Sequence, residues 1–443
     1  MSFYKFKEIS SSRRKIISNV LWASLGKVVN LFGSLFVGIL IARYLGPEQY
    51  GLMNYVISYV SLFTIIASFG LTNIEVRELA KSPKDRDPLM GTCFWIRIFC
   101  ASLGYALIVI TLCIYRPDYF TCVLILIYGT TLFTSCFEVI RNYFTSIVQN
   151  KYVVKSEITR TIIGACIKLF LLYLEAPLLY FIIAVAFDTV LVSSGYVIAY
   201  SEKVGKMSSW KMKKDIVPYL IRQSFPLLLS GAAIIVYQRI DQLMIGNMID
   251  KESVGYFATA GKFLDIVLFI PMVLTQTVTP MLVKKKKSST VDDYWKYAWK
   301  FSSVIIWTAV ILAAILSLSS YIVIKYTYGE AYLMAVPVLQ ILAWKTVGMA
   351  LSSTSGQLII IDGKQKWAVV RNLCGCFTCV LLNYMLIPVY GIIGSASVTI
   401  ITVIVSGYLA NALIPSYRYV FKIQSYALLW GWKELIYFKS LMR

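Results

Sequence analysis

The sequence contains no histidine and few acidic residues, and both absences narrow the function classes open to it. Histidine is the most frequent general acid or base in enzymes, so an acid–base mechanism built on an imidazole is excluded. Asp and Glu number 22 against 43 Lys and Arg. Charged residues make up 15% of the 443 residues and hydrophobic residues 58%, whereas soluble proteins have about 25% charged residues. The composition is therefore typical of a membrane protein.

Signatures of nucleotide binding and of nucleophilic catalysis are absent as well. "GYFATAGKF" at 255–263 resembles a phosphate-binding loop. However, five residues rather than four separate its glycines, and Phe263 stands where Ser or Thr would bind Mg²⁺. The sequence also lacks a G-x-S-x-G turn. The net charge of +21 suggests a nucleic-acid partner at first, but the basic residues lie in short gaps between apolar runs. We expect no nucleic-acid partner, no cofactor and no enzymatic activity.

All nine cysteines lie within apolar runs, so the sequence offers no extracytoplasmic disulfide framework. Three of them, Cys374, Cys376 and Cys379, have a spacing that resembles a metal cluster. They lie in an apolar helical pattern with no fourth ligand nearby, which is typical of buried thiols. We expect no metal site.

Apolar runs of roughly 17–25 residues mark membrane-spanning helices, and we predict twelve of them. They lie at about 16–41, 50–72, 89–114, 119–140, 157–175, 178–200, 224–246, 255–282, 301–325, 333–360, 368–388 and 391–414. The gaps that alternate along this pattern hold 33 Lys and Arg on one side and four on the other. Because basic loops stay in the cytoplasm, we predict that both termini are cytoplasmic.

A basic gap after six predicted spans divides the chain into near-equal halves. We predict an N-terminal six-helix bundle at 1–203, a cytoplasmic linker at 204–223, a C-terminal six-helix bundle at 224–415 and an interfacial amphipathic tail at 416–443. The segments "ARYLGPEQYGLMNY" and "LMIGNMIDKESVGYF" share a glycine at the end of a helix, an acidic or amide turn, and a second glycine next to an aromatic residue at the start of the next helix. In this comparison Gly51 and Gly255 are equivalent. The repeat favours two related bundles with a substrate site between them near the membrane midplane.

Ionisable side chains inside the predicted spans are costly, so each one is a candidate for function. We assign a substrate-binding role to six cations, Lys27, Arg97, Lys168, Arg239, Lys262 and Lys345. Asp188, Asp241 and Asp265 are candidates for binding a coupling ion.

Two simpler explanations account for some of these cations. A long side chain near a helix end can extend to the interface, which suits Arg239, Lys168 and Lys262 better than the deeper Lys27 and Lys345. Lys262 and Asp265 also share one helix face and can pair. Six cations against three carboxylates still leave a surplus of three. The predicted fold is therefore an all-α polytopic membrane protein, with twelve transmembrane helices in two six-helix bundles around a central cationic cavity built for an anion.

Three stretches of the sequence carry a resemblance to a known family. They are "ILIARYLGPEQYGLMNYVISYVSLFTIIASFGL" with the following "VRELAK", "SFPLLLSGAAIIVYQRIDQLMIGNMIDKESVGYFATAGKF", and "YTYGEAYLMAVPVLQILAW". The chain resembles the polysaccharide flippases of the MOP exporter superfamily, the Wzx-type O-antigen transporters, over nearly its full length. The resemblance implies a MATE-like fold in the bacterial cytoplasmic (inner) membrane. It also implies movement of an undecaprenyl-diphosphate-linked oligosaccharide from the cytoplasmic to the outer leaflet.

The same resemblance implies the partners. These are membrane lipids, H⁺ or Na⁺ as the coupling ion, and a polysaccharide polymerase and a chain-length regulator. Three alternatives remain open at this point. A MATE-like exporter of small molecules shares the fold but moves cations, a polymerase or ligase typically has a long outer loop, and a peptidoglycan-precursor flippase usually has fourteen helices.

Overall fold

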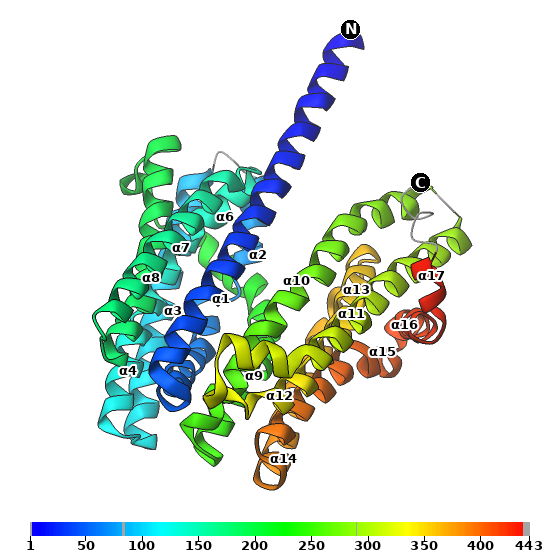
Figure 1. Cartoon of the computed structure of the whole chain (residues 1–443). Coiled ribbons are helices and arrows are strands. Elements are labelled where there is room, and N and C mark those ends of the chain that lie inside the picture. Colours follow the sequence, from blue (N-terminus) through cyan, green and yellow to red (C-terminus); the bar gives the residue numbers. More distant parts are fainter. Residues whose placement is uncertain (1, 82–84, 289, 437–443) are drawn as a thin grey trace. The chain divides into compact units, whose positions relative to one another are not determined.

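The structure is a computed structural model that describes residues 2–81, 85–288 and 290–436, which are almost entirely helical (Figure 1). The first eight helices are α1 (Ser2–Ser68), α2 (Thr72–Lys81), α3 (Arg86–Tyr115), α4 (Tyr119–Gly129), α5 (Thr131–Thr134), α6 (Glu138–Ser146), α7 (Asn150–Tyr173) and α8 (Leu178–Lys203). The others are α9 (Val217–Met248), α10 (Lys251–Ser288), α11 (Val291–Thr327), α12 (Ala335–Leu342), α13 (Lys345–Ile361), α14 (Ala368–Ile404), α15 (Ala410–Leu413), α16 (Arg418–Trp430) and α17 (Trp432–Ile436).

Aspartate side chains cap the N-termini of α4 and α10. The Asp118 carboxylate accepts a hydrogen bond of 2.8 Å from the Thr121 backbone N–H at the start of α4. The Asp250 carboxylate accepts one of 2.7 Å from the backbone of Ser253 at the start of α10. These bonds satisfy N–H groups that have no partner within the helix. The turns before these helices are therefore encoded locally by the sequence.

Nine helical segments of the described residues are long and apolar enough to cross a membrane. Two of them, 25–81 and 365–413, each cover two predicted spans, and each has a non-helical glycine where those spans meet. Gly46 (φ 72°, ψ 171°) precedes Pro47, and Gly391 (φ 57°, ψ −139°) follows Pro388. Positive φ is accessible to glycine at little cost, so both glycines allow a change of chain direction. The predicted span at 157–175 lies in α7, which is not among the nine. The count of twelve stays a prediction.

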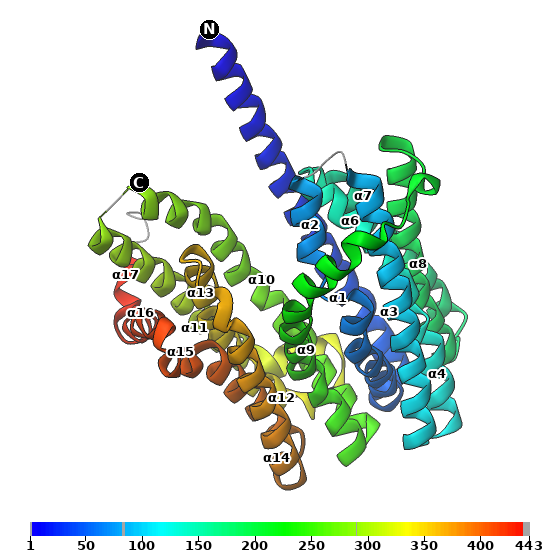
Figure 2. The same ribbon diagram turned by 180° about the vertical axis from the view of Figure 1, so that it is seen from behind.

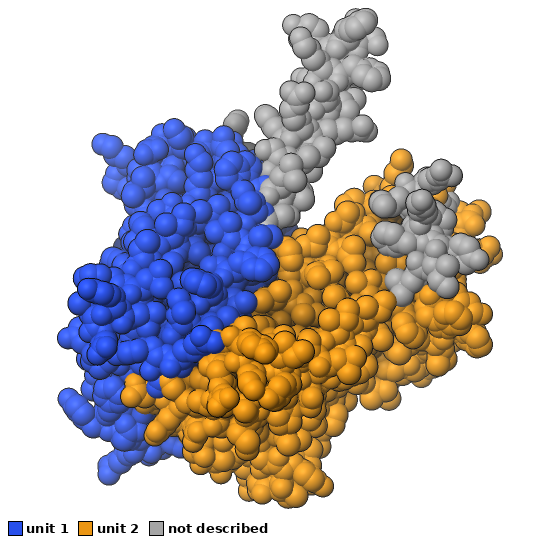
Figure 3. Space-filling model, in the orientation of Figure 1, with its two compact units in different colours: residues 1–45, 56–232 blue, residues 46–55, 233–443 orange. Residues whose placement is uncertain are grey.

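The chain forms two compact units (Figure 3). Unit 1 consists of residues 1–45 and 56–232, and unit 2 of residues 46–55 and 233–443. The division falls inside α9, and α1 contributes to both units. The domain boundaries predicted from the sequence stay a prediction.

Within unit 1, α7 and α8 lie side by side along their length (Figure 1 and Figure 2). A core of buried side chains from α2, α3, α6 and α8 includes Met90, Phe144 and Tyr200, and Trp210 packs against it. The indole N–H of Trp210 donates a 3.0 Å hydrogen bond to the Tyr200 hydroxyl. The segment between α8 and α9 is therefore fastened to this core.

Within unit 2, α16 packs against α11 and α13 in a second core. The side chain of Gln424 on α16 is buried and donates to the backbone carbonyls of Leu351 (2.8 Å) and Gly407 (3.0 Å). The predicted amphipathic tail at 416–443 is thus helical over its described part, with one face in the core. Tyr437, Phe438, Lys439 and Arg443 of that tail lie outside the described residues.

Candidate functional site

A polar pocket in unit 2 brings together five of the nine side chains predicted for function. Arg239 and Asp241 come from α9, Lys262 and Asp265 from α10, and Lys345 from the start of α13. The pocket has a volume of about 230 Å³. Its three cations face two carboxylates, so its formal charge is positive. This grouping of charged side chains is the candidate functional site.

Amide side chains complete the polar wall of this pocket. Asn54, Gln238 and Gln242 line it together with the ions. Charge alone did not single them out in the sequence, although Gln238 and Gln242 flank Arg239 and Asp241 directly. Amides both donate and accept hydrogen bonds, so the pocket offers contacts to hydroxyl groups as well as to charged groups.

Asp241 is nearly fully buried (2% exposed) and binds α14. Its carboxylate accepts hydrogen bonds from the Asn383 amide (2.7 Å), the Thr399 hydroxyl (2.8 Å) and the Cys379 thiol (3.2 Å). A buried carboxylate is tolerated only when such donors compensate for the lost water. Asp241 therefore joins the pocket wall on α9 to α14. Sequence reasoning left open whether it braces a neighbouring helix or binds a coupling ion, and this geometry provides the brace.

The cations of the pocket have fewer polar partners than Asp241. The ammonium group of Lys345 interacts electrostatically with the carboxylates of both Asp241 and Asp265. Arg239 is exposed, and over the described part of the chain neither Arg239 nor Lys262 forms an ion pair. The pairing considered for Lys262 and Asp265 is thus not formed here. The pocket retains positive charge for an anionic ligand.

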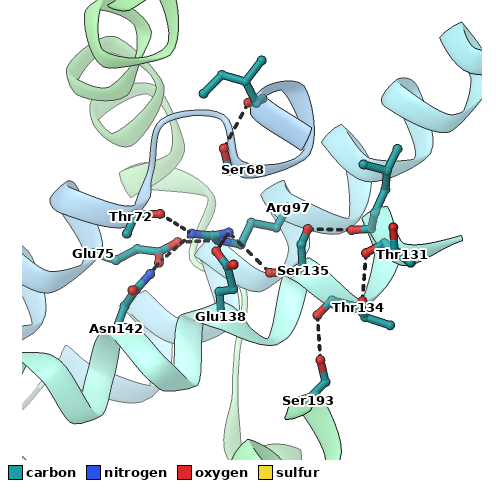
Figure 4. A network of polar contacts seen from close by, with 12 residues as sticks. Ser68, Thr72, Glu75, Arg97, Thr131, Thr134, Ser135, Glu138, Asn142 and Ser193 are labelled. Atoms are coloured by element: carbon teal, nitrogen blue, oxygen red, sulfur yellow. Dashed lines mark hydrogen bonds and ion pairs between the residues drawn. The ribbon is translucent and has the colours of Figure 1, made fainter. Parts of the chain in front are cut away.

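Arg97, which we expected in the cationic cavity, lies instead in a closed network of unit 1 (Figure 4). Its side chain and that of Glu75 are both 0% exposed, and the guanidinium binds the carboxylate through Nε (2.8 Å) and Nη2 (3.0 Å). This two-bond geometry is the strong form of an Arg–carboxylate pair. The Asn142 amide also donates to Glu75, and Thr72 and Glu138 accept from Arg97 at 3.2 and 3.5 Å.

This network joins three helices of unit 1. Thr72 and Glu75 belong to α2, Arg97 to α3, and Glu138 and Asn142 to α6. The prediction for Arg97 counted three acids inside the spans. It omitted Glu138, in the predicted span at 119–140, and Glu157 and Glu175, in the predicted span at 157–175. Glu75 lies in a predicted gap between two spans, where an acidic residue is expected to be solvated and was not considered as a partner for Arg97. Arg97 is therefore paired for a structural reason that its own span did not reveal.

The remaining predicted residues lie in unit 1 and do not join one site. Lys168 on α7 forms an ion pair with Asp188 on α8. This contact explains both residues without a ligand, because each compensates the charge of the other. Lys27 is exposed on α1. Their predicted roles in substrate and ion binding stay predictions.

The chain is similar to known proteins both in sequence and in structure. A family model described as polysaccharide biosynthesis protein matches residues 16–286, which is more than half of the chain. No curated protein matches it. Among solved structures, an inward-facing multidrug resistance MATE family transporter of the MOP superfamily matches with a TM-score of 0.67 at 14% identity, covering 92% of this chain and 99% of that one. The lipid II flippase MurJ in an inward closed conformation matches with a TM-score of 0.65 at 16% identity, covering 96% and 100%.

A further match supports the same fold. The MATE multidrug transporter DinF-BH has a TM-score of 0.65 at 15% identity, with 92% of this chain and 96% of that chain covered. At these identities the likeness establishes the fold and not the substrate. The predicted MOP fold is confirmed, and the chain is a multi-pass membrane protein.

Proposed function

Because the chain belongs to the polysaccharide biosynthesis protein family, we propose that it is a flippase for a lipid-linked oligosaccharide. In this proposal it moves an undecaprenyl-diphosphate-linked repeat unit, such as an O-antigen unit, from the cytoplasmic to the outer leaflet of the bacterial inner membrane. Its partners are the lipid-linked substrate, the membrane lipids, and the polymerase and chain-length regulator that use the product.

The observation that carries this proposal is the pocket of unit 2. Arg239, Lys262 and Lys345 converge there from three helices that are separated in the sequence. A diphosphate is an anion, and a guanidinium binds phosphate oxygens through two N–H groups at once. The adjacent amides of Gln238 and Gln242 suit sugar hydroxyls. The pocket thus has the chemistry to bind both parts of a sugar diphosphate.

A small-molecule exporter is the alternative with the same fold. MATE proteins are similar in structure to this chain, and a multidrug exporter that carries organic cations requires a site with excess negative charge. Three cations against two carboxylates give the opposite sign here. The charge of the pocket therefore favours the anionic substrate.

Ion coupling is a further part of the proposal. Asp241 is the acid in the pocket wall that contacts α14 through Asn383 and Thr399. A carboxylate, a hydroxyl and an amide supply oxygen atoms that a proton or Na⁺ can bind. Binding there changes the charge next to Lys345, which would link the coupling ion to the anion site.

The proposal is tested by locating the lipid-linked repeat unit in cells that lack the protein. We expect the units to accumulate on the cytoplasmic face, protected from a membrane-impermeant reagent in intact spheroplasts. Wild-type protein and the control variant Lys325→Gln, at the far end of α11, should restore exposure. The double variant Arg239→Gln/Lys345→Gln should not restore it at equal protein level. Units that reach the outer face but stay unpolymerised in the deletion strain would contradict flipping and favour a polymerase.

A further inference from the structure

A second, mostly apolar pocket lies in unit 2 between α11 and α16. From α11 it is lined by Trp295, Lys296 and Trp299, and from α16 by Tyr419, Lys422, Ile423 and Tyr426. These residues recur at intervals of one, three and four positions, so each set lies on one helix face. The pocket has a volume of about 460 Å³, within the range of about 300–1,000 Å³ typical of ligand sites.

The walls of this pocket are held rigidly by contacts on their buried sides. The Trp307 indole N–H donates a 3.0 Å hydrogen bond to the backbone carbonyl of Ala427, which ties α11 to α16. The rings of Trp295 and Tyr419 meet edge to face at 5.1 Å, and the Tyr419 hydroxyl donates to Asp362 at 2.6 Å. The pocket is therefore a preformed feature of the fold.

Two lysine side chains line a pocket that is otherwise apolar. Lys296 and Lys422 are both exposed. Among the described residues, neither forms an ion pair, whereas the neighbouring Lys300 pairs with Glu434 at 3.5 Å. A ligand that is apolar at one end and anionic at the other would complement these groups.

The position in the chain indicates where such a ligand comes from. Lys296 lies in the basic gap at 284–300, which charge asymmetry predicts to be cytoplasmic, and α16 follows the last apolar segment. Trp and Tyr concentrate at the level of lipid headgroups, and anionic lipids attract lysines at the cytoplasmic surface. With the predicted orientation, the pocket lies at the level where phospholipid headgroups meet acyl chains.

We propose that the pocket between α11 and α16 binds one anionic phospholipid of the surrounding membrane. Its phosphate lies against Lys296 and Lys422, and the start of an acyl chain packs on Trp295, Trp299 and Tyr426. The site is separate from the Arg239 pocket and does not depend on the flippase proposal. The bound lipid contacts both α11 and α16, and so helps to hold α16 against the rest of unit 2.

Native mass spectrometry of the purified full-length protein tests this site with phosphatidylglycerol and phosphatidylcholine added in equal amounts. We expect the wild type to retain phosphatidylglycerol preferentially. Each lysine changed to Gln should weaken retention about fivefold, since one basic residue near the membrane surface contributes about that factor. Tyr426→Ala removes an exposed ring on which the acyl chain packs, so it should weaken retention with little change in the unfolding temperature. The matched control Lys203→Gln/Lys214→Gln removes two exposed lysines, one at the end of α8 and one in the segment after it, and should retain the lipid fully.

Several results would overturn the proposal. Equal retention of phosphatidylcholine, or unchanged retention by Lys296→Gln/Lys422→Gln, would remove the role of charge. Preferential retention of a polyprenyl phosphate would assign the pocket to another lipid class. Lipid binding that appears only after removal of residues 437–443 would make the chain itself the occupant. Should the double variant fail to fold, the two single variants, each at an exposed position, carry the same test.

Discussion

Gly51 and Gly255 pack backbone against backbone in unit 2. A Cβ atom on Gly51 would lie 1.7 Å from the carbonyl oxygen of Lys251, and one on Gly255 would lie 2.1 Å from that of Pro47. The same offset of 204 residues relates Gly51 to Gly255 and Pro47 to Lys251. The contact is therefore symmetric with respect to the repeat seen in the sequence. Only glycine permits so close an approach of two helices.

Replacing Gly51 with Ala should destabilise the protein, because the added methyl group meets backbone atoms that cannot turn aside. We expect a loss of about 1–3 kcal/mol in the free energy of unfolding, as for other overpacked sites. Thermal unfolding in detergent measures it. Gly38→Ala in the same helix is the control, since a Cβ there meets nothing within 4 Å. A Gly51→Ala protein as stable as this control would contradict the close contact.

Removing the buried partner of Glu75 should be far more costly than removing an exposed one. Arg97→Met leaves the Glu75 charge without compensation, and we expect a loss of about 3–5 kcal/mol. Arg77→Met breaks a surface pair with Glu78, which is worth at most about 1 kcal/mol. Adding Glu75→Gln to Arg97→Met should recover part of the loss. Equal unfolding temperatures for the two single variants would show that the network does not stabilise unit 1.

Changing Asp241 to Asn should weaken the attachment of α9 to α14. The amide keeps the shape but replaces one acceptor with a donor that faces the Asn383 amide or the Thr399 hydroxyl. Since a hydrogen bond to a charged group contributes about 1.5–3 kcal/mol, we expect a loss of that order. A double-mutant cycle with Lys345→Met measures the coupling between the two charges. Strict additivity would show that Asp241 and Lys345 do not interact.

At Arg239, charge should matter more than shape if the pocket binds a diphosphate. Arg239→Lys keeps the cation but loses the two-pronged geometry, so we expect reduced export of the repeat unit. Arg239→Gln should nearly abolish export while the protein still inserts, because the span becomes more apolar. Export is measured by the amount of repeat unit that reaches the outer face of the membrane. Normal export by Arg239→Gln at the wild-type protein level would exclude a role in binding.

The predicted orientation can be examined with single cysteines placed in a cysteine-free background. Positions in the gaps at 201–222 and 284–300 should react with a membrane-impermeant thiol reagent only after the membrane is opened. Positions beside Arg116 and Lys325, which lie in predicted outer gaps, should react in intact cells. These outer positions serve as the internal control for reagent access. Labelling of the 201–222 gap in intact cells would reverse the orientation.

The sequence by itself determined the class of the protein and the places where its helices break. Hydropathy and charge are local properties, so the long apolar helices follow from composition over about twenty residues. The break at Gly46 likewise follows from a glycine next to Pro47, and the break at Gly391 from a glycine three residues after Pro388. The equivalence of Gly51 and Gly255 could be recognised as a repeat in the amino-acid sequence alone.

Which ions meet was decided only by the tertiary structure. Arg97, Lys168 and Arg239 all appear in the sequence as cations within apolar runs. Arg97 forms an ion pair with Glu75, and Lys168 forms one with Asp188. Arg239 instead lines a pocket together with Lys262 and Lys345. Helical periodicity places a side chain on a face of its own helix. The partner of that face depends on how helices distant in sequence cross, and this is set by packing across the whole unit.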